Sequence, residues 1–230
     1  MHAFYCEKIE AAGDIVTLER MESDHLFKTL RGRVGDVVML LDGKGKSAMA
    51  EIVEGKALRV NEITIHEAPA KDIYLFMAAP RKQKLDQILK QATELGVKGI
   101  AIMHCDFSVA LPEGSSRWET ILLEACKQSN NPFIPEILPV MKFQEALNYI
   151  EKNQIVGIFG DVEESKESLS ASENMKKFAF FVGPEGGFSD KEISQMRSNG
   201  FVGLNLGPYI LRLETAAVCG IAVLRKIFTN

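Results

Sequence analysis

Two glycine-rich turns near the carboxyl terminus carry the residues best suited to bind and act on a small molecule. The first is Gly183-Pro184-Glu185-Gly186-Gly187, and the second begins at Gly207-Pro208. Glycines let the backbone approach a ligand closely, so that main-chain N–H and C=O groups can bind it. Arg212 and Glu214 follow the second turn. A guanidinium at this place would stabilise developing negative charge, and a carboxylate beside it would orient the guanidinium or accept a proton. The pattern predicts a ligand site with backbone donors.

Neither turn matches a known nucleotide-binding fingerprint. The chain lacks G-x-x-x-x-G-K-[ST], the phosphate cradle of P-loop proteins, and it lacks G-x-G-x-x-G after an early strand. A dinucleotide-dependent dehydrogenase is therefore disfavoured. One alternative stays open from the residues alone, namely that these glycines only turn corners and that Arg212 and Glu214 form a structural ion pair.

Short apolar strands are predicted directly before both turns, at Phe178–Val182 and Phe201–Leu206. Parallel strands would place both turns at one edge of a sheet, where open α/β sheets bind small molecules. After the first turn, Ser189-x-x-Glu192 is a capping box that opens a helix ending near Gly200. After the second turn, a mostly apolar helix is predicted to start at Ile210.

The chain before these turns divides into two parts. Up to about residue 68, short β-prone runs surround a hairpin tip at 42–46 and predict a small β-barrel. From Ile73 onward, strands alternate with amphipathic helices and predict a mostly parallel α/β sheet. We place the domains at residues 1–69 and 72–230, and we expect 163–174, rich in Ser and Glu, to be a solvated loop. The other predicted elements are strands at 37–41, 48–53, 58–65, 73–79, 97–104 and 155–161, and helices at 85–95, 118–125 and 143–152.

The composition is that of an ordinary globular protein, with 46% hydrophobic and 25% charged residues. No apolar run is long enough for a membrane span, and the amino terminus does not read as a secretory signal. The four cysteines are scattered and lack a C-x-x-C pair, so neither a metal site nor a disulfide framework is indicated, and a cytoplasmic location fits. Because the net charge is −4, any contact with nucleic acid must come from a local basic patch.

GPEGGFSDKE followed by LGPYILRLETA resembles the paired signature of the SPOUT-class RNA methyltransferases, and of the RsmE family in particular. The similarity continues through HLFKTLRGRVGD, KQATELGVKGI and RWETILLEACKQS. The resemblance implies a PUA-like, RNA-binding β-barrel, a SPOUT α/β domain with a carboxy-terminal trefoil knot, and a homodimer formed through the knotted domain. It also implies methyl transfer from S-adenosylmethionine to N3 of a uridine in 16S ribosomal RNA of the small subunit, without a metal.

The resemblance carries roles to individual residues. The catalytic roles are our own hypothesis: Arg212 and Glu214 are expected to be catalytic because Arg212 stands between the pocket-forming Leu211 and the start of a helix. The implied cofactor-binding residues are Gly160, Gly183, Glu185, Gly186, Gly187, Leu206, Gly207, Ile210, Leu211, Thr215 and Ala216. The candidate RNA-binding residues are Lys28, Arg31, Arg33, Lys44, Lys82 and Lys84. Phe107 and Asn131 stand where relatives usually carry a basic residue, so the RNA contacts carry over only in part.

Two alternatives of function remain. The first alternative is a SPOUT methyltransferase that acts on another base or on ribose. The second is an RNA-binding assembly factor without catalysis. Mapping the modified position distinguishes the first alternative from methylation at uridine N3. A cofactor-binding titration distinguishes the second alternative from an enzyme. The sequence leaves open whether free RNA or the assembled subunit is the substrate, and which group, if any, is the general base.

Overall fold

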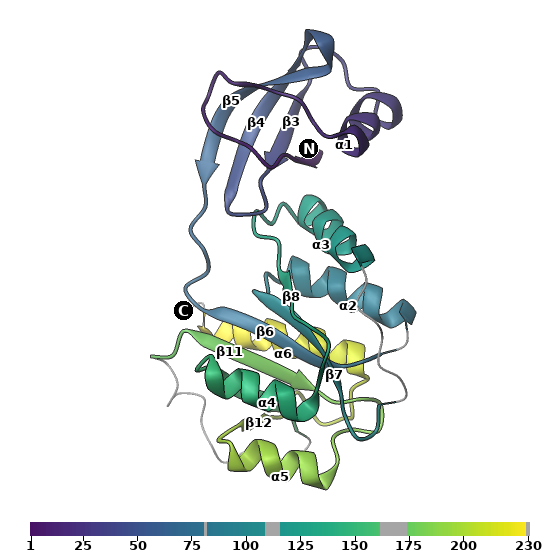
Figure 1. The fold of residues 1–230 in the computed structure, drawn as a ribbon, viewed down its shortest axis with the longest axis vertical. Helices are drawn as coiled ribbons and strands as arrows, with labels where there is room; N and C mark the ends of the chain where they lie inside the picture. Colours follow the sequence, from purple (N-terminus) through teal and green to yellow (C-terminus); the bar gives the residue numbers. More distant parts are fainter. Residues whose placement is uncertain (81, 109–115, 162–173, 229–230) are drawn as a thin grey trace. The chain divides into compact units, whose positions relative to one another are not determined.

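The computed structural model describes residues 1–80, 82–108, 116–161 and 174–228 (Figure 1). The chain forms two compact units, each with its own sheet. The amino-terminal unit contains Met1–Ala68 and Leu122–Ile134, and the carboxy-terminal unit contains Pro69–Ile121 and Pro135–Asn230. Most of the solvated loop expected at 163–174, and the side chain of Lys82, lie outside the described residues.

The amino-terminal unit is built on a five-stranded mixed sheet, the half-barrel that corresponds to the predicted PUA-like barrel. Its order is β1-β3-β4-β5-β2, with β1 parallel to β3 and the other pairs antiparallel. A short α-helix and a π-helix precede β3. The elements are β1 (Ala3–Tyr5), β2 (Ile15–Val16), α1 (Arg20–Asp24), η1 (His25–Thr29), β3 (Val37–Leu41), β4 (Lys46–Val53), η2 (Glu54–Lys56) and β5 (Ala57–Ile65).

Apolar side chains from this sheet form the core of the unit. Leu40, Ala50, Ile52, Leu58 and Val60 are essentially fully buried. The connection of β3 to β4 is the hairpin tip predicted from the sequence, because the Asp42 carboxylate accepts hydrogen bonds from two backbone N–H groups of the tip, at 2.7 and 2.8 Å. The return segment 122–134 packs on this tip, since the Phe133 ring lies directly over Gly45.

The carboxy-terminal unit contains a sheet in which every described strand pair is parallel, as the alternation of strands and helices predicts. The strand order is β12-β10-β11-β6-β7-β8, with β9 also paired to β7. The central strand β11 is buried on both faces, as expected from its apolar run. The strands are β6 (Asp72–Ala78), β7 (Gly99–His104), β8 (Glu136–Ile137), β9 (Met141–Lys142), β10 (Val156–Gly160), β11 (Lys177–Val182) and β12 (Val202–Leu204).

Helices cover both faces of this sheet. Figure 1 shows α6 behind the sheet and α4 in front of it, and α6 also packs against α2. One glycine of α6, Gly220, permits the close approach of α6 to β11, because a side chain there would meet the ring of Phe180. The helices are α2 (Lys82–Glu94), α3 (Ser116–Ser129, which continues into the amino-terminal unit from Leu122), α4 (Phe143–Lys152), α5 (Asp190–Ser198) and α6 (Leu213–Phe228).

The predicted start of the last helix was wrong. The helix begins at Leu213 rather than at Ile210, because Gly207 takes a φ of +142° and the chain after Pro208 runs irregularly along a cavity. The trefoil knot stays a prediction, since strand order alone does not test it. Among the described residues, no helix is both long and apolar enough to cross a membrane.

Candidate functional site

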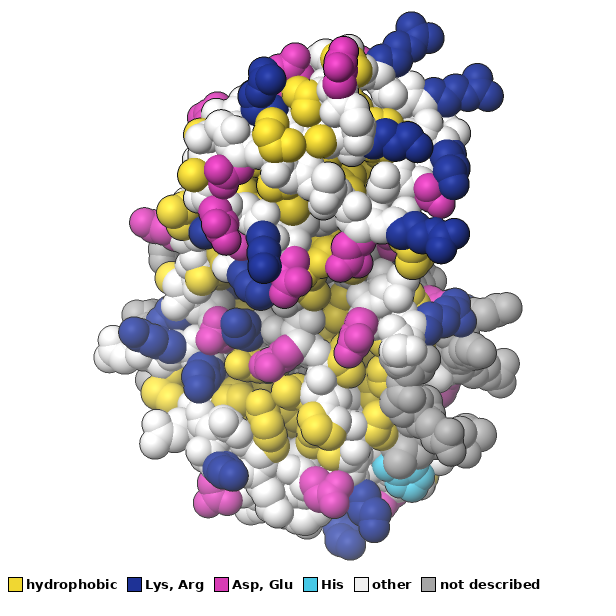
Figure 2. Space-filling view, turned by 45° about the horizontal axis from the view of Figure 1, so that its top comes forward, with side chains coloured by type: hydrophobic (Ala, Val, Ile, Leu, Met, Phe, Trp, Pro, Cys, Tyr) yellow, Lys and Arg dark blue, Asp and Glu magenta, His cyan; other side chains and the backbone are white. Residues whose placement is uncertain are grey.

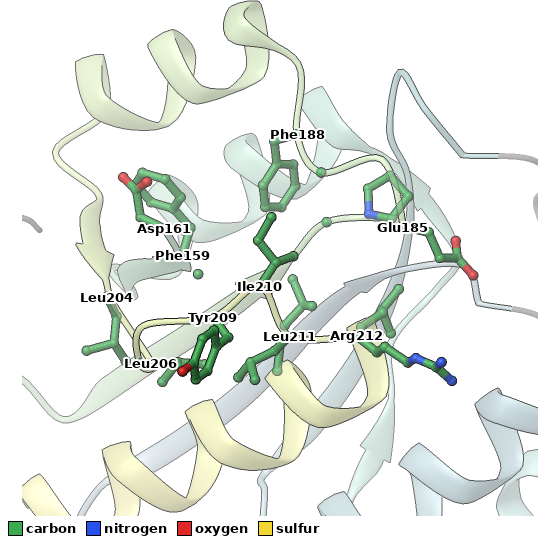
Figure 3. A pocket seen from close by; sticks show the side chains of 18 of the residues that line it. Phe159, Asp161, Glu185, Phe188, Leu204, Leu206, Tyr209, Ile210, Leu211 and Arg212 are labelled. Carbon is green, nitrogen blue, oxygen red and sulfur yellow. The ribbon is translucent and has the colours of Figure 1, made fainter. Parts of the chain in front are cut away.

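A cavity of the carboxy-terminal unit opens at the carboxyl ends of β10, β11 and β12 (Figure 3). Its volume of about 440 Å³ falls in the range typical of small-molecule sites. Both glycine turns line it, so the structure brings together the two segments that the sequence analysis expected at one sheet edge. Ligands of open α/β sheets bind in this location, outside the carboxyl ends of the strands.

The first turn, residues 183–188, is fixed by its own backbone. The Gly187 N–H donates to the Pro184 carbonyl at 2.8 Å, and Gly187 has a φ of +78°, which favours glycine. A Cβ atom at Gly183 would lie 3.0 Å from the backbone of residues 187 and 188, so this position tolerates no side chain without a shift of the turn.

The predicted capping box of α5 is confirmed. The Glu192 N–H donates to the Ser189 hydroxyl at 3.2 Å, and the Ser189 N–H donates to the Glu192 carboxylate at 2.9 Å. The other oxygen of the buried Glu192 accepts the Asp106 N–H, and the Ser189 hydroxyl donates to the Asp106 carboxylate. The segment after β7 therefore supports the start of α5 and, with it, the first turn.

The second turn, residues 205–212, closes the opposite wall of the cavity. The Gly207 N–H donates to the Asn205 side chain at 2.8 Å, which fixes the bend after β12. Tyr209 and Ile210 line the cavity although they are 83% and 89% exposed. In the view of Figure 3, Ile210 lies between Phe188 of the first turn and Tyr209.

Most of the expected cofactor-binding residues lie in the cavity wall. Gly186 and Thr215 do not line it: Gly186 faces Phe107 instead, with its Cβ position 3.3 Å from the Cβ of Phe107, and Thr215 is exposed on α6. The expected residues that do line the cavity are Gly160, Gly183, Glu185, Gly187, Leu206, Gly207, Ile210, Leu211 and Ala216.

The structure adds lining residues that the sequence analysis missed. Phe159 and Asp161 flank Gly160 at the end of β10, and Leu204 ends β12. The rule that ligands bind beyond the carboxyl ends of parallel strands would have indicated these positions. The further lining residues are Val182, Pro184, Phe188, Ile193, Tyr209 and Leu213.

Of the two residues expected to be catalytic, Arg212 lines the cavity and Glu214 does not. The Glu214 carboxylate accepts a hydrogen bond from the ammonium of Lys84, on the first turn of α2. This hydrogen bond, together with the nearby charge of Arg212, lowers the pKa of Glu214. An ionised carboxylate held by Lys84 is suited to orienting Arg212 and poorly suited to accepting a proton.

Another charged group of the cavity wall, Asp161, is also paired. Its carboxylate accepts a hydrogen bond from Arg197 of α5 at 3.0 Å. In the described ranges, no three His, Cys, Asp or Glu side chains lie close enough together to hold a metal ion.

The basic residues expected to contact RNA lie in both units. In the amino-terminal unit, Lys28, Arg31, Arg33 and Lys44 are exposed, and Lys28 pairs with Asp24 at 2.9 Å. Arg31 has a φ of +57°, an uncommon conformation for a residue with a side chain. Figure 2 shows Lys and Arg side chains projecting from this unit, with Asp and Glu side chains among them. In the carboxy-terminal unit, Lys84 is committed to Glu214.

Comparison with known proteins gives a consistent result. The family model of the RNA methyltransferase domain matches residues 66–225. The ribosomal RNA small subunit methyltransferase E of Aquifex aeolicus is 31% identical, over 97% of this chain and 99% of the relative.

Two solved structures cover nearly the whole chain. A ribosomal RNA small subunit methyltransferase E from Neisseria gonorrhoeae, bound to S-adenosyl methionine, is 26% identical with a TM-score of 0.87, over 99% of this chain and 98% of the other. A methyltransferase from Legionella pneumophila, in complex with the same cofactor, is 25% identical with a TM-score of 0.84, over 98% and 97%.

Proposed function

Because this chain belongs to the RNA methyltransferase family, and within it to the ribosomal RNA small subunit methyltransferases E, we propose that it methylates N3 of a uridine in 16S ribosomal RNA. The methyl donor is S-adenosylmethionine, the molecule bound to both similar structures. The observation that carries the proposal is the cavity walled by the two glycine turns at the carboxyl edge of the sheet.

The residues of the cavity fit this cofactor. S-adenosylmethionine supplies an electrophilic methyl group on a positively charged sulfur. Because Gly183, Gly187 and Gly207 carry no side chain, the backbone of both turns is open to the cavity, which suits the edges of an adenine ring. The apolar side chains of Leu206, Ile210 and Leu211 suit its faces.

Arg212 has the chemistry that the substrate requires. The N3 position of uracil carries an imide proton, and the nitrogen becomes nucleophilic only when this proton leaves. A guanidinium near O2 or O4 stabilises the resulting anion. Arg212 lies at the rim of the cavity with its side chain exposed. Glu214, which pairs with Lys84, is two residues after Arg212 in the sequence. We assign Arg212 to charge stabilisation and Glu214 to the orientation of Arg212.

The amino-terminal unit is suited to hold the RNA backbone. Lys28, Arg31, Arg33 and Lys44 are exposed, and such side chains bind phosphates without reading sequence. The π-helix η1 and the positive φ of Arg31 give this segment a locally unusual backbone, of the kind often found at functional sites. Lys82, at the start of α2, and Lys84 are the candidates in the other unit.

A homodimer through the carboxy-terminal unit is part of the proposal. The outward face of α6 exposes Ala222, Val223 and Ile227, and Tyr209 and Ile210 are exposed beside the cavity. A second copy would cover apolar surface that is otherwise in water. Sedimentation equilibrium tests this part, and a monomer at micromolar concentration would contradict it.

A substrate in the small ribosomal subunit would place the enzyme in the cytoplasm.

The deciding experiment is transfer of a labelled methyl group to unmodified small subunits, followed by mapping of the label. A single label at N3 of one uridine supports the proposal. A label on another base or on ribose supports the first alternative of function. Tight binding of S-adenosylmethionine without any transfer supports the non-catalytic alternative.

The variant Arg212→Ala tests the assigned role of the guanidinium. We expect the single-turnover rate to fall about 10²- to 10³-fold, since one donor to a developing negative charge is lost. The affinity for S-adenosylmethionine, measured by calorimetry, should change by less than about threefold, which separates chemistry from cofactor binding. Lys90→Ala, an exposed position on α2, is the matched control. A wild-type rate for Arg212→Ala would remove the guanidinium from the mechanism.

A further inference from the structure

The proposed reaction leaves one proton without an acceptor, and this inference rests on that proposed function. The imide proton of uracil N3 must leave before or during methyl transfer. Arg212 can stabilise the anion, but a guanidinium has no acceptor site and stays protonated in proteins. A carboxylate or imidazole in contact with the substrate is suited to take this proton as the general base.

The carboxylates near the described cavity wall differ in their existing partners. Glu214 lies outside the wall and is held ionised by Lys84. Asp161 is paired with Arg197, and Figure 3 shows it on the side of the cavity away from Arg212. Glu185 is exposed, lines the cavity, and lies on the same side as Arg212 in Figure 3. No hydrogen bond or ion pair to the Glu185 side chain is found among the described residues.

The backbone that carries Glu185 is well fixed, although its side chain is accessible. Pro184 is buried, and its carbonyl accepts the Gly187 N–H, which closes the turn around residue 185. On the other side, Gly186 packs against Phe107. The carboxylate therefore projects from a preorganised turn, and little backbone entropy is lost when a substrate is bound.

We propose that Glu185 is the general base that takes the N3 proton. The target uracil would lie between Glu185 and Arg212, because its edge presents an N–H donor next to a carbonyl acceptor. These two groups match the carboxylate and the guanidinium in polarity. Docked RNA would remove water from the exposed carboxylate, which favours proton uptake.

The step balances in atoms and charge. The N3–H bond breaks and its proton passes to the Glu185 carboxylate. The N3 electron pair forms the bond to the methyl carbon as the carbon–sulfur bond breaks, and the sulfur keeps the electron pair as a neutral thioether. The protonated Glu185 then loses its proton to solvent after the product leaves.

The test uses Glu185→Gln in the full-length chain, with Glu94→Gln as the isosteric control on the exposed end of α2. We expect the single-turnover rate of Glu185→Gln to fall about 10²- to 10⁴-fold, the usual contribution of a general base. The rate of this variant should rise steeply between pH 7 and 9, because ionisation of the uracil in solution then replaces the missing base. S-adenosylmethionine affinity by calorimetry should stay within about threefold of the wild type.

Three outcomes would overturn the assignment. The first is a rate of Glu185→Gln within about threefold of the wild type. The second is a loss of rate that follows a loss of cofactor affinity and recovers at saturating cofactor, which makes Glu185 a cofactor-holding residue. The third is a variant whose pH–rate profile parallels that of the wild type. If the wild type itself transfers no methyl group to small subunits, the proposed function fails, and this result is distinct from all three.

Discussion

Two ion-pair groups, one in each unit, place similar residues in very different surroundings. In the amino-terminal unit, Lys127 of α3 lies 2.6 Å from Glu22 of α1 and 2.7 Å from Glu124, and its side chain is only 5% exposed. In the carboxy-terminal unit, Lys84 pairs with Glu214 beside the cavity, and its side chain is 42% exposed. The two groups differ mainly in how much water each ammonium retains.

This difference separates stability from function. Burial by itself would lower the pKa of Lys127, but its hydrogen bonds to Glu124 and Glu22 raise the pKa above the ordinary value. Lys127 also ties α3 to Glu22, whose second oxygen accepts the Tyr5 N–H. Lys84 joins the first turn of α2 to Glu214 in the first turn of α6, next to the rim of the cavity. We infer that the buried group maintains the fold and that the exposed group orients Arg212.

The largest expected effect is on stability, in the variant Lys127→Met. Removal of the cation leaves the buried Glu22 carboxylate without compensation, so the free energy of unfolding should fall by about 3 to 5 kcal/mol. Urea unfolding followed by circular dichroism measures this change. In Lys90→Met, where the lysine is exposed on α2, the same free energy should change by less than about 0.5 kcal/mol. Equal stability of the two variants would contradict the inference that the buried Lys127 group maintains the fold.

For Lys84→Met we expect a smaller effect on stability and a clear effect on the reaction rate. The free energy of unfolding should change by less than about 1 kcal/mol, because a half-exposed pair contributes little. The single-turnover rate should fall about tenfold, because Glu214 no longer holds a fixed geometry beside Arg212. Binding of small subunits, measured in parallel, shows whether Lys84 acts instead on RNA. A rate defect that saturating subunits abolish would assign Lys84 to RNA binding and would contradict its role in orienting Arg212 through Glu214.

The smallest effect concerns acid pH. The folded-state pKa of Glu214 is lowered, so its pair contributes to stability above the ordinary pKa of glutamate, about 4.3, and this contribution is lost as the pH falls through the lowered value. The stability difference between the wild type and Glu214→Gln should be less than about 1 kcal/mol at pH 7 and should shrink in acid. Urea midpoints at both pH values test this. A difference that grows in acid would contradict the direction of the shift.

Local signals explain what could be predicted from the sequence. The capping box at Ser189 and Glu192 fixed the start of α5, because both partners lie within one helical turn. The apolar run Phe178–Val182 of β11 identified a strand buried on both faces, and the glycines of both turns indicated the cavity. The start of α6 was misplaced because apolar residues such as Ile210 and Leu211 suit a helix and a cavity wall equally well.

Long-range pairing explains what could not be predicted. Glu22 and Lys127 are 105 positions apart, and Lys84 and Glu214 are 130 positions apart. No spacing rule connects such residues, so the sequence analysis linked neither pair. Lys84, next to Lys82, was interpreted as an RNA contact, and the commitment of its ammonium to Glu214 became visible only in the folded chain.

The discontinuous composition of the amino-terminal unit has a consequence for biosynthesis. Residues 1–68 leave the ribosome first. The segment that completes this unit, with Lys127, Phe133 and Ile134, follows only after residues 69–121 of the other unit have been translated. Until then Glu22 lacks its cation, and the glycines of the hairpin tip lack the side chains that cover them. The half-barrel therefore cannot be finished while it is the only part outside the exit tunnel, and it would not transfer to another protein as one uninterrupted stretch of sequence.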